Sequence, residues 1–274
     1  MRDEQYLLGH SDHEEQRLRR QAQELAHETR WLIEEIGVAP GARALDLGCG
    51  PEGALLLLAE RIGPSGAVVG LDVSARSVAL ARELVRGRGL AGVEVIEGDA
   101  RATALPRASF DLVHARFVLI NVPRPEEIVK EMITLTRPGG VVACHEGDYG
   151  TYRCDPPHPS WDRLLDVFES FSRDRGIDPF IGRRVYSTLC AAGLVDVRVR
   201  PLIHAYPHGH PRRPILIEFI DNIRAGLLES GRISEDELNA HVQALREHLA
   251  RPDVMVISHL FFQVWGRRPG ATAP

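Results

Sequence analysis

The chain has 274 residues, of which 44% are hydrophobic and 26% are charged, and its formal net charge is −5. This length and apolar content predict one large globular domain, or a domain with a substantial insertion. The acidic balance argues against a broad nucleic-acid surface, which would need an excess of basic residues.

The first predicted element is a helix over residues 12–36, whose apolar residues recur at helical spacing. Pro40-Gly41 then interrupts the chain before the first strand signal. We therefore expect an N-terminal helical cap, residues 1–40, followed by the main domain, residues 41–274.

Strand and helix signals alternate through the next hundred or so residues, with glycine and proline breakers between them. Such alternation predicts a mostly parallel sheet that is covered by helices on both faces. The predicted elements are strand 43–47, helix 53–62, strand 67–71, helix 74–88, strand 93–97, strand 110–115, helix 125–136 and strand 140–146.

The pattern changes after Tyr149, where three prolines within 151–159 predict an irregular loop. The two helices before the last strand interrupt what would otherwise be a terminal strand pair. Because they should emerge near the carboxyl ends of the strands, we interpret 205–253 as a helical lid over a ligand site. The elements predicted in this part are helices 160–175, 181–192, 214–229 and 234–250 and strands 195–203 and 255–265.

Two features bear on location and redox state. No apolar run reaches the roughly 18 residues of a membrane span, and the N-terminal residues are charged, so we expect a cytoplasmic protein without a membrane segment. The four cysteines lie far apart and form no Cys-x-x-Cys pair. They indicate reduced thiols and argue against a disulfide frame and a zinc site.

Residues 43–53 form the most informative stretch, an apolar strand that ends in a glycine turn and opens a helix. Gly48 and Gly50 permit backbone angles closed to other residues and let a ligand lie against the main chain. Their spacing also fits a dinucleotide loop, so the glycines alone leave the ligand open. Asp46 separates the alternatives, because a phosphate-binding loop should be neutral or positive, whereas a carboxylate suits a cationic ligand.

Acidic residues also follow the second and third predicted strands. Asp72 ends the second strand, where a carboxylate can accept hydrogen bonds from both ribose hydroxyls of a nucleoside. Asp99 follows the third strand within Gly98-Asp99-Ala100. The carboxyl ends of parallel strands meet at one edge of a sheet, so we expect these acids in one cleft.

Over about residues 41–147, these motifs and their order resemble the class I S-adenosylmethionine (SAM) methyltransferases of the small-molecule type. The resemblance implies a Rossmann-like sheet of seven strands, SAM as the methyl donor and a small organic acceptor. It implies that Asp46 lies near the amino group of the donor, and that Asp99 and Ala100 contact adenine. Glu52 departs from the glycine that many relatives carry. The donor contacts implied are Tyr6, Gln21, Asp46, Gly48, Cys49, Gly50, Asp72, Val73, Asp99, Ala100 and Arg116.

Candidate acceptor contacts lie at the end of the predicted fifth strand, within residues 144–149. Methyl transfer is an in-line displacement that depends mainly on alignment, and a general base is needed only when the acceptor must lose a proton. His145 has the pKa best suited to that task. We predict His145, Glu146 and Tyr149 as the catalytic set, under the helical acceptor lid.

Several alternatives stay open. An NAD(P)-dependent oxidoreductase would share the glycine turn and Asp72, and a non-catalytic SAM-binding module would share the whole donor site. The acceptor could be an aromatic or heterocyclic specialised metabolite, methylated on oxygen, nitrogen or carbon. The histidine-rich segment 204–210 lacks the matching acids or cysteines of a metal site, so we expect none. The chain could form a homodimer.

Overall fold

A computed structural model describes residues 7–9 and 11–270 of the chain. Its central sheet has seven strands in the order β3-β2-β1-β4-β5-β10-β7. The first five of these strands pair in parallel, and β10 runs antiparallel to both of its neighbours. The predicted fold class is thereby confirmed. The strands are β1 (Arg43–Leu47), β2 (Ala67–Asp72), β3 (Val93–Glu97), β4 (Phe110–Arg116), β5 (Thr136–Asp148), β7 (Val195–Leu202) and β10 (Leu260–Arg267).

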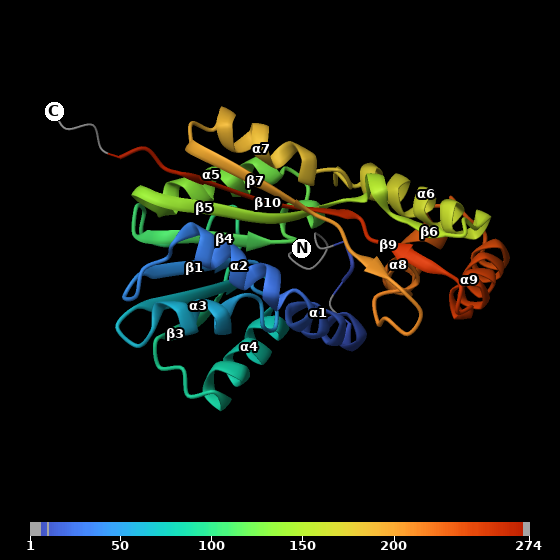
Figure 1. The fold of residues 1–274 in the computed structure, drawn as a ribbon, viewed down its shortest axis with the longest axis horizontal. Helices are drawn as coiled ribbons and strands as arrows, with labels where there is room; N and C mark the ends of the chain where they lie inside the picture. Colours follow the sequence, from blue (N-terminus) through green and yellow to red (C-terminus); the bar gives the residue numbers. More distant parts are fainter. Residues whose placement is uncertain (1–6, 10, 271–274) are drawn as a thin grey trace.

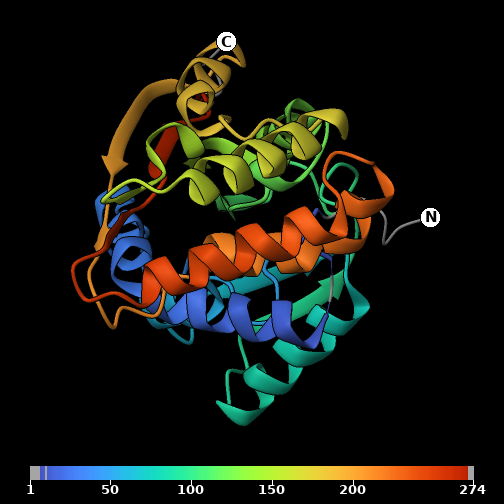
Figure 2. The same cartoon turned by 90° about the vertical axis from the view of Figure 1, so that its right-hand side faces the viewer.

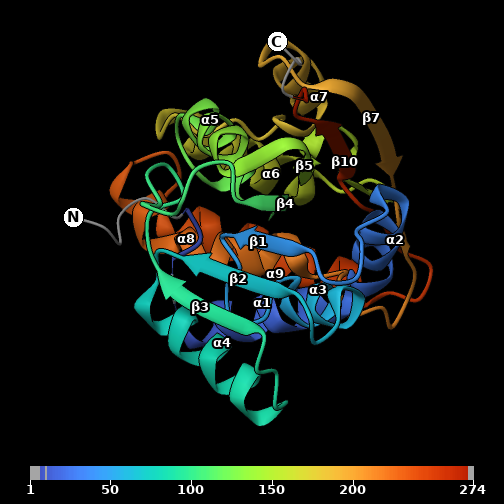
Figure 3. The same ribbon diagram turned by 90° about the vertical axis from the view of Figure 1, so that its left-hand side faces the viewer.

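Helices cover both faces of this sheet (Figures 1 and 3). Side chains alternate along a strand, so neighbouring residues enter different cores. Ala44 and Val68 lie in the core with α2, α3 and α4, whereas Leu45 and Val69 lie in the core with α5, α6 and α7. These helices are α2 (Ala26–Ile36), α3 (Leu55–Ile62), α4 (Ala75–Gly87), α5 (Pro125–Leu135), α6 (Pro159–Asp174) and α7 (Gly182–Ala191).

The single helix predicted over 12–36 is wrong in one respect, because the chain breaks at Leu25 into α1 (Asp12–Glu24) and α2. Leu25 has φ −100° and ψ 13°, outside helical geometry. The two helices bury different surfaces. The apolar side of α2 packs on the sheet, while α1 buries polar residues, among them Glu14 and Arg17. One straight helix could not serve both surfaces.

The C-terminal part adds a second, three-stranded sheet in the order β6-β9-β8. The predicted strand 255–265 is therefore two strands in different sheets, separated at Ser258 and His259. The backbone N–H of His204 donates to Ser258 Oγ at 2.9 Å, and Ser258 N–H donates to His204 O at 2.9 Å. These bonds turn the chain out of the main sheet. The strands are β6 (Arg153–Asp155), within the predicted irregular loop, β8 (Ala205–Tyr206) and β9 (Met255–Ile257).

Two further helices, α8 (Ile215–Glu229) and α9 (Glu235–Ala250), pack with α6 at the end of the molecule seen in Figure 2. Short 3-10 helices, η2 (Leu119–Asn121) and η3 (Tyr149–Thr151), follow β4 and β5. Among the described residues, no helix combines the length and apolar character needed to cross a membrane.

Candidate active site

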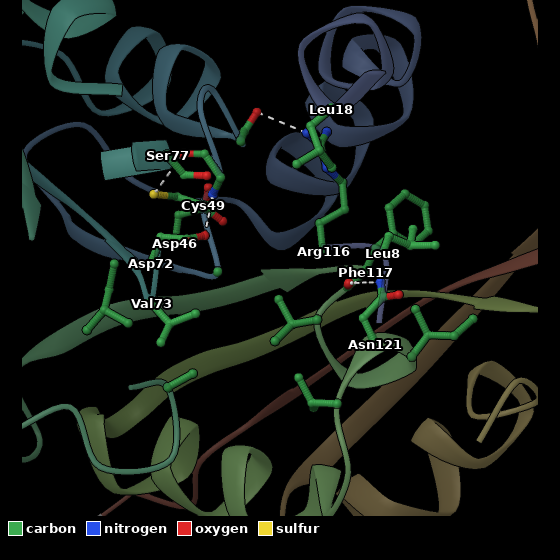
Figure 4. A pocket seen from close by; sticks show the side chains of 18 of the residues that line it. Leu8, Leu18, Asp46, Cys49, Asp72, Val73, Ser77, Arg116, Phe117 and Asn121 are labelled. Carbon is green, nitrogen blue, oxygen red and sulfur yellow. Dashed lines mark hydrogen bonds between the residues drawn. The ribbon is translucent and has the colours of Figure 1, made fainter. Parts of the chain in front are cut away.

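A cavity opens at the carboxyl ends of the central strands, with an empty volume of about 1370 Å³ when its open mouth is included. It collects residues from several separate elements of the chain (Figure 4). Tyr6, the remaining predicted donor contact, lies outside the described residues. The predicted donor contacts that line the cavity are Gln21, Asp46, Gly48, Cys49, Gly50, Asp72, Val73, Asp99, Ala100 and Arg116.

The glycine loop after β1 forms one wall. Gly48, Gly50 and Gly53 have φ values of 65°, 57° and 55°, in the left-handed region that favours glycine. A Cβ at Gly53 would fall 2.4 Å from Asp46 Oδ2 and 2.5 Å from the Cys49 carbonyl oxygen. The backbone N–H of Gly50 donates to Asp72 Oδ2 at 2.8 Å, which ties the loop to the end of β2.

Asp46 lies beneath this loop, and only 2% of its surface is exposed. Its Oδ2 accepts the backbone N–H of Ala54 at 2.8 Å, and its Oδ1 lies 2.7 Å from His114 Nδ1. The carboxylate therefore fixes the turn into α3. An ammonium group in the cavity would have to donate to the lone pairs of Asp46 that Ala54 and His114 leave unused.

The other two acids sit farther along the same wall. Asp72 Oδ1 accepts the N–H of Ser74 at 2.9 Å, at the start of α4. Asp99 forms an ion pair with Arg101, with Oδ2 at 2.7 Å from a guanidinium nitrogen. Apolar Val73 and Ala100 line the space between them. Carboxylates that accept hydrogen bonds, next to apolar surfaces, fit the hydroxyls, amino groups and flat base of a nucleoside.

Arg116 ends β4 and brings a positive charge to the cavity. It donates to Thr29 Oγ1 at 2.8 Å and to the Gly53 carbonyl at 3.0 Å. Burial lowers the pKa of Arg116, while the charges of Asp46 and Glu52 oppose that shift. The guanidinium remains cationic, because arginine does not lose its proton in proteins.

The structure does not bring His145 or Glu146 to the cavity. His145 is fully buried in β5, with its ring 5.0 Å from that of Phe117, and burial lowers its pKa well below the ordinary value. Glu146 accepts three backbone N–H groups from residues 118–120, at 3.0–3.1 Å. Burial raises the pKa of Glu146 to about 8, and those three donors oppose the rise. Glu146 thereby holds the backbone of residues 118–120, two of which line the cavity.

Tyr149, the third predicted catalytic residue, does line the cavity. Its ring stacks on His259 with centroids 4.9 Å apart and lies 6.3 Å from the ring of Phe219. Burial raises its pKa above 10. Tyr149 thus joins an aromatic wall made of segments far apart in the sequence.

Sequence reasoning missed most of that second wall. Its η2 residues follow β4, so the rule that ligands lie at strand ends could have found them. Phe219 and His259 gave no local signal. Figure 4 shows Leu8, Phe117 and Asn121 across the cavity from Asp46 and Asp72. The missed residues of this wall are Leu8, Phe117, Val118, Ile120, Asn121, Val122, Ile128, Phe219 and His259.

A buried polar network connects α1 to α8 beside the cavity. Arg17, which lines the cavity, donates to Glu14 at 2.6 and 2.7 Å and to Gln21 Oε1 at 2.8 Å. Asn222 of α8 donates to Glu14 at 2.7 Å. The Arg17 guanidinium also lies 5.2 Å from the centre of the Phe219 ring. These contacts hold the two helices together at the cavity wall.

Comparison with known proteins places this site in a family. A methyltransferase-domain family model matches residues 39–158. The demethylmenaquinone methyltransferase of Geobacillus stearothermophilus is 34% identical over 182 residues, which cover 62% of this chain and 78% of that protein. The corresponding enzyme of Geobacillus kaustophilus is 40% identical over 182 residues, with the same coverage.

Solved structures agree in fold. A putative methyltransferase from Bacillus halodurans superposes with a TM-score of 0.59 and 16% identity, over 89% of this chain and 99% of that one. A phosphoethanolamine N-methyltransferase from Haemonchus contortus gives a TM-score of 0.57 and 19% identity, over 89% and 52%. These relatives, together with the cavity described above, show that the chain belongs to the class I SAM-dependent methyltransferases, and SAM is its methyl donor.

Proposed function

We propose that the enzyme methylates a small, planar, hydroxylated aromatic acceptor of the quinol type. The observation that carries this proposal is that a single cavity joins a wall of carboxylates and glycines to a wall of aromatic and aliphatic side chains. SAM supplies an electrophilic methyl group on a positively charged sulfur. The residues of the chain bind the donor, align the acceptor and exclude water.

The donor half is assigned to the wall formed after β1, β2 and β3. Asp72 accepts the ribose hydroxyls, and Asp99 and Ala100 hold the adenine. The glycine loop, with Asp46 beneath it and Gln21 and Arg116 at its side, holds the methionine portion. A hydrogen bond to a charged group contributes about 1.5–3 kcal/mol, so Asp72 alone accounts for at least roughly a tenfold change in affinity.

The acceptor half is assigned to the aromatic wall, which Phe117, Tyr149 and Phe219 dominate. A flat ring can stack against such side chains, and each aromatic contact contributes about 0.5–1.5 kcal/mol beyond area burial. Asn121 and His259 add polar groups that could orient a ring hydroxyl. The Geobacillus relatives are named for demethylmenaquinone, a quinone, and the lining here suits a ring of that chemistry.

The cap of residues 1–40 and the lid of residues 205–253 are proposed to close this cavity as one unit. Arg20 of α1 donates to both carboxylate oxygens of Glu218 in α8, at 2.8 and 2.6 Å. The buried Arg212, just before α8, donates to Glu24 of α1 at 3.0 Å. Such links would make the two segments open together when ligands exchange.

Two measurements test the proposal. Calorimetric titration should show binding of S-adenosylhomocysteine and none of NADH. The enzyme should then transfer labelled methyl from SAM to a reduced naphthohydroquinone, with the product identified by mass. A panel of alternative acceptors, tested in the same way, includes a simple phenol, a catechol and phosphoethanolamine. Selective methylation of the aliphatic amine would contradict the proposed acceptor class, and absence of S-adenosylhomocysteine binding would contradict the donor site.

A further inference from the structure

His259 is the imidazole that lines the cavity within the described part of the chain. It lies in the two-residue break between β9 and β10 and is 5% exposed. Its ring stacks on Tyr149 at 4.9 Å and lies 4.3 Å from Phe261 and 5.5 Å from Tyr152. Aromatic rings therefore fix the plane of this imidazole.

The backbone beneath His259 is held as firmly as its ring. Ser258 Oγ donates to the His259 carbonyl at 2.7 Å, and Thr151 Oγ1 donates to the Ser258 carbonyl at 3.1 Å. His259 Nδ1 is enclosed without a hydrogen-bond partner among the described residues. This leaves Nε2 as the nitrogen that can face a ligand in the cavity. The imidazole is thus a pre-positioned polar group in a wall that is mostly aromatic and aliphatic.

Burial, together with the charged groups around it, keeps the ring of His259 neutral. Arg17 from α1 and Arg212 from the segment before α8 are both cationic, and the ring of His204 packs on Phe261, as the ring of His259 does. Burial first, and these neighbours second, lower the pKa of His259 well below its ordinary value. A neutral imidazole retains the lone pair that accepts a proton. The arginines also favour an acceptor oxygen that becomes negative.

We propose that His259 is the catalytic base, which accepts the proton that the acceptor hydroxyl loses during methyl transfer. This role rests on the proposed function and restricts its acceptors to molecules with an ionisable ring hydroxyl beside the methylated atom. The O–H bond breaks toward His259 Nε2, and the electron pair released into the acceptor forms the new bond to the methyl carbon. When the methylated atom is a ring carbon, that carbon keeps its hydrogen in a keto product, which then enolises to restore the aromatic ring and its hydroxyl. The electrons of the old carbon–sulfur bond stay on sulfur, and the imidazolium then loses its proton to solvent.

The test compares His259→Gln and His259→Asn with His204→Gln as a matched control. His204 also packs on Phe261, at 5.5 Å, but does not line the cavity. With naphthohydroquinone as acceptor, the His259 variants should lose at least about 100-fold in kcat, the lower range for general acid–base catalysis, with affinity for S-adenosylhomocysteine unchanged. The control should retain the wild-type kcat.

The pH profile separates a base from a packing residue. The wild-type rate should be flat above pH 6.5, because the lowered pKa keeps His259 neutral there. The rate of the variants should rise about tenfold per pH unit as the acceptor ionises in solution. Wild-type kcat in the variants, a flat variant profile, or a parallel loss of S-adenosylhomocysteine affinity would each overturn the assignment.

A spectroscopic readout covers the case in which both variants unfold. In wild-type protein with labelled histidine, the His259 nitrogen resonances should shift when naphthohydroquinone is added to the S-adenosylhomocysteine complex. Resonances that do not respond to a bound acceptor would overturn the role. Failure of the wild type to methylate any hydroxylated ring would instead refute the proposed function, and this role with it.

Discussion

The donor wall and the acceptor wall of the cavity are built by different means. The donor wall comes from backbone turns that follow β1, β2 and β3, and its shape depends on left-handed glycines and on hydrogen bonds such as that from Gly50 to Asp72. The acceptor wall consists of side chains from the segment before α1, from the connection between β4 and α5, and from α5, η3, α8 and the break before β10. Local sequence therefore dictates the first wall, and long-range packing dictates the second.

This difference implies distinct responses to substitution. A changed donor wall should lose SAM affinity steeply, because a backbone turn cannot adjust by a small amount. A changed acceptor wall should alter acceptor use while the donor still binds, since packed side chains can relax individually. The following experiments probe that contrast.

The largest effect is expected for Gly53→Ala. Its new Cβ would meet Cys49 backbone and the Asp46 carboxylate, so the glycine loop must move. Misplacement by about 1 Å can reduce activity by about 100-fold, and we expect a loss of that order in kcat/KM, together with weaker binding of S-adenosylhomocysteine. Gly63→Ala is the control, with φ 72° but no atom within 4 Å of the added carbon. If calorimetry showed equal affinity of both variants for S-adenosylhomocysteine, the contrast between the two walls would be contradicted.

Asp72→Asn should follow, with affinity for S-adenosylhomocysteine reduced at least about tenfold through weaker hydrogen bonds to the ribose. Its control is Glu97→Gln, because Glu97 is the exposed register partner of Asp72 on β3 and does not line the cavity. Both variants lose one negative charge at the same edge of the sheet. An equal loss of affinity in both would indicate a general charge effect.

The contrast between the walls also explains how much could be predicted from sequence. Alternating apolar strands and amphipathic helices locate nearly every element of the central sheet, and glycines with adjacent acids predict the cavity wall to which we assign the donor. The break at Ser258 could not be predicted, because it depends on a hydrogen bond with His204, 54 residues earlier. His259 was consequently hidden inside a predicted continuous strand.

The orientation of His145 was equally inaccessible. Its position at the end of β5 correctly places it near the cavity, but strand alternation turns its ring toward Phe117 and Phe261. Likewise, the break at Leu25 depends on α1 packing against α8, whose residues lie about two hundred positions later. The periodicity of apolar residues over 12–36 indicates one buried face of a helix. It does not indicate the second, polar face that α1 buries.

The buried His145 of β5 should make the stability of the folded chain depend on pH. The unfolded chain protonates His145 near pH 6.5, whereas the folded state resists protonation, so lower pH favours unfolding below that value. Glu146, whose pKa burial raises to about 8, has the opposite effect, so that between pH 8 and pH 4.5 a lower pH favours the folded state. Comparing His145→Gln with wild type isolates the histidine. Urea unfolding between pH 5.5 and 6.5 gives the free energy of unfolding at each pH. The slope of this free energy against pH should be smaller in the variant by up to about 1.4 kcal/mol per pH unit. Identical slopes would contradict this account.

The smallest effect is expected for Phe219→Leu, which trims the acceptor wall without removing its apolar surface. Loss of one aromatic contact, about 1 kcal/mol, should raise the acceptor KM about fivefold. The affinity for S-adenosylhomocysteine should not change. Leu228→Ala on the same helix, outside the cavity, serves as the control. A weaker donor complex with an unchanged acceptor KM would reverse the assignment of the two walls.

The most direct test of the two-walled cavity is a crystal structure of the enzyme with S-adenosylhomocysteine. We predict that the ribose lies on Asp72, that the methionine portion lies along the glycine loop, and that the sulfur faces Phe117, Tyr149 and His259. A complex in which the sulfur points away from these aromatic residues, or in which the ligand occupies another part of the molecule, would contradict the account.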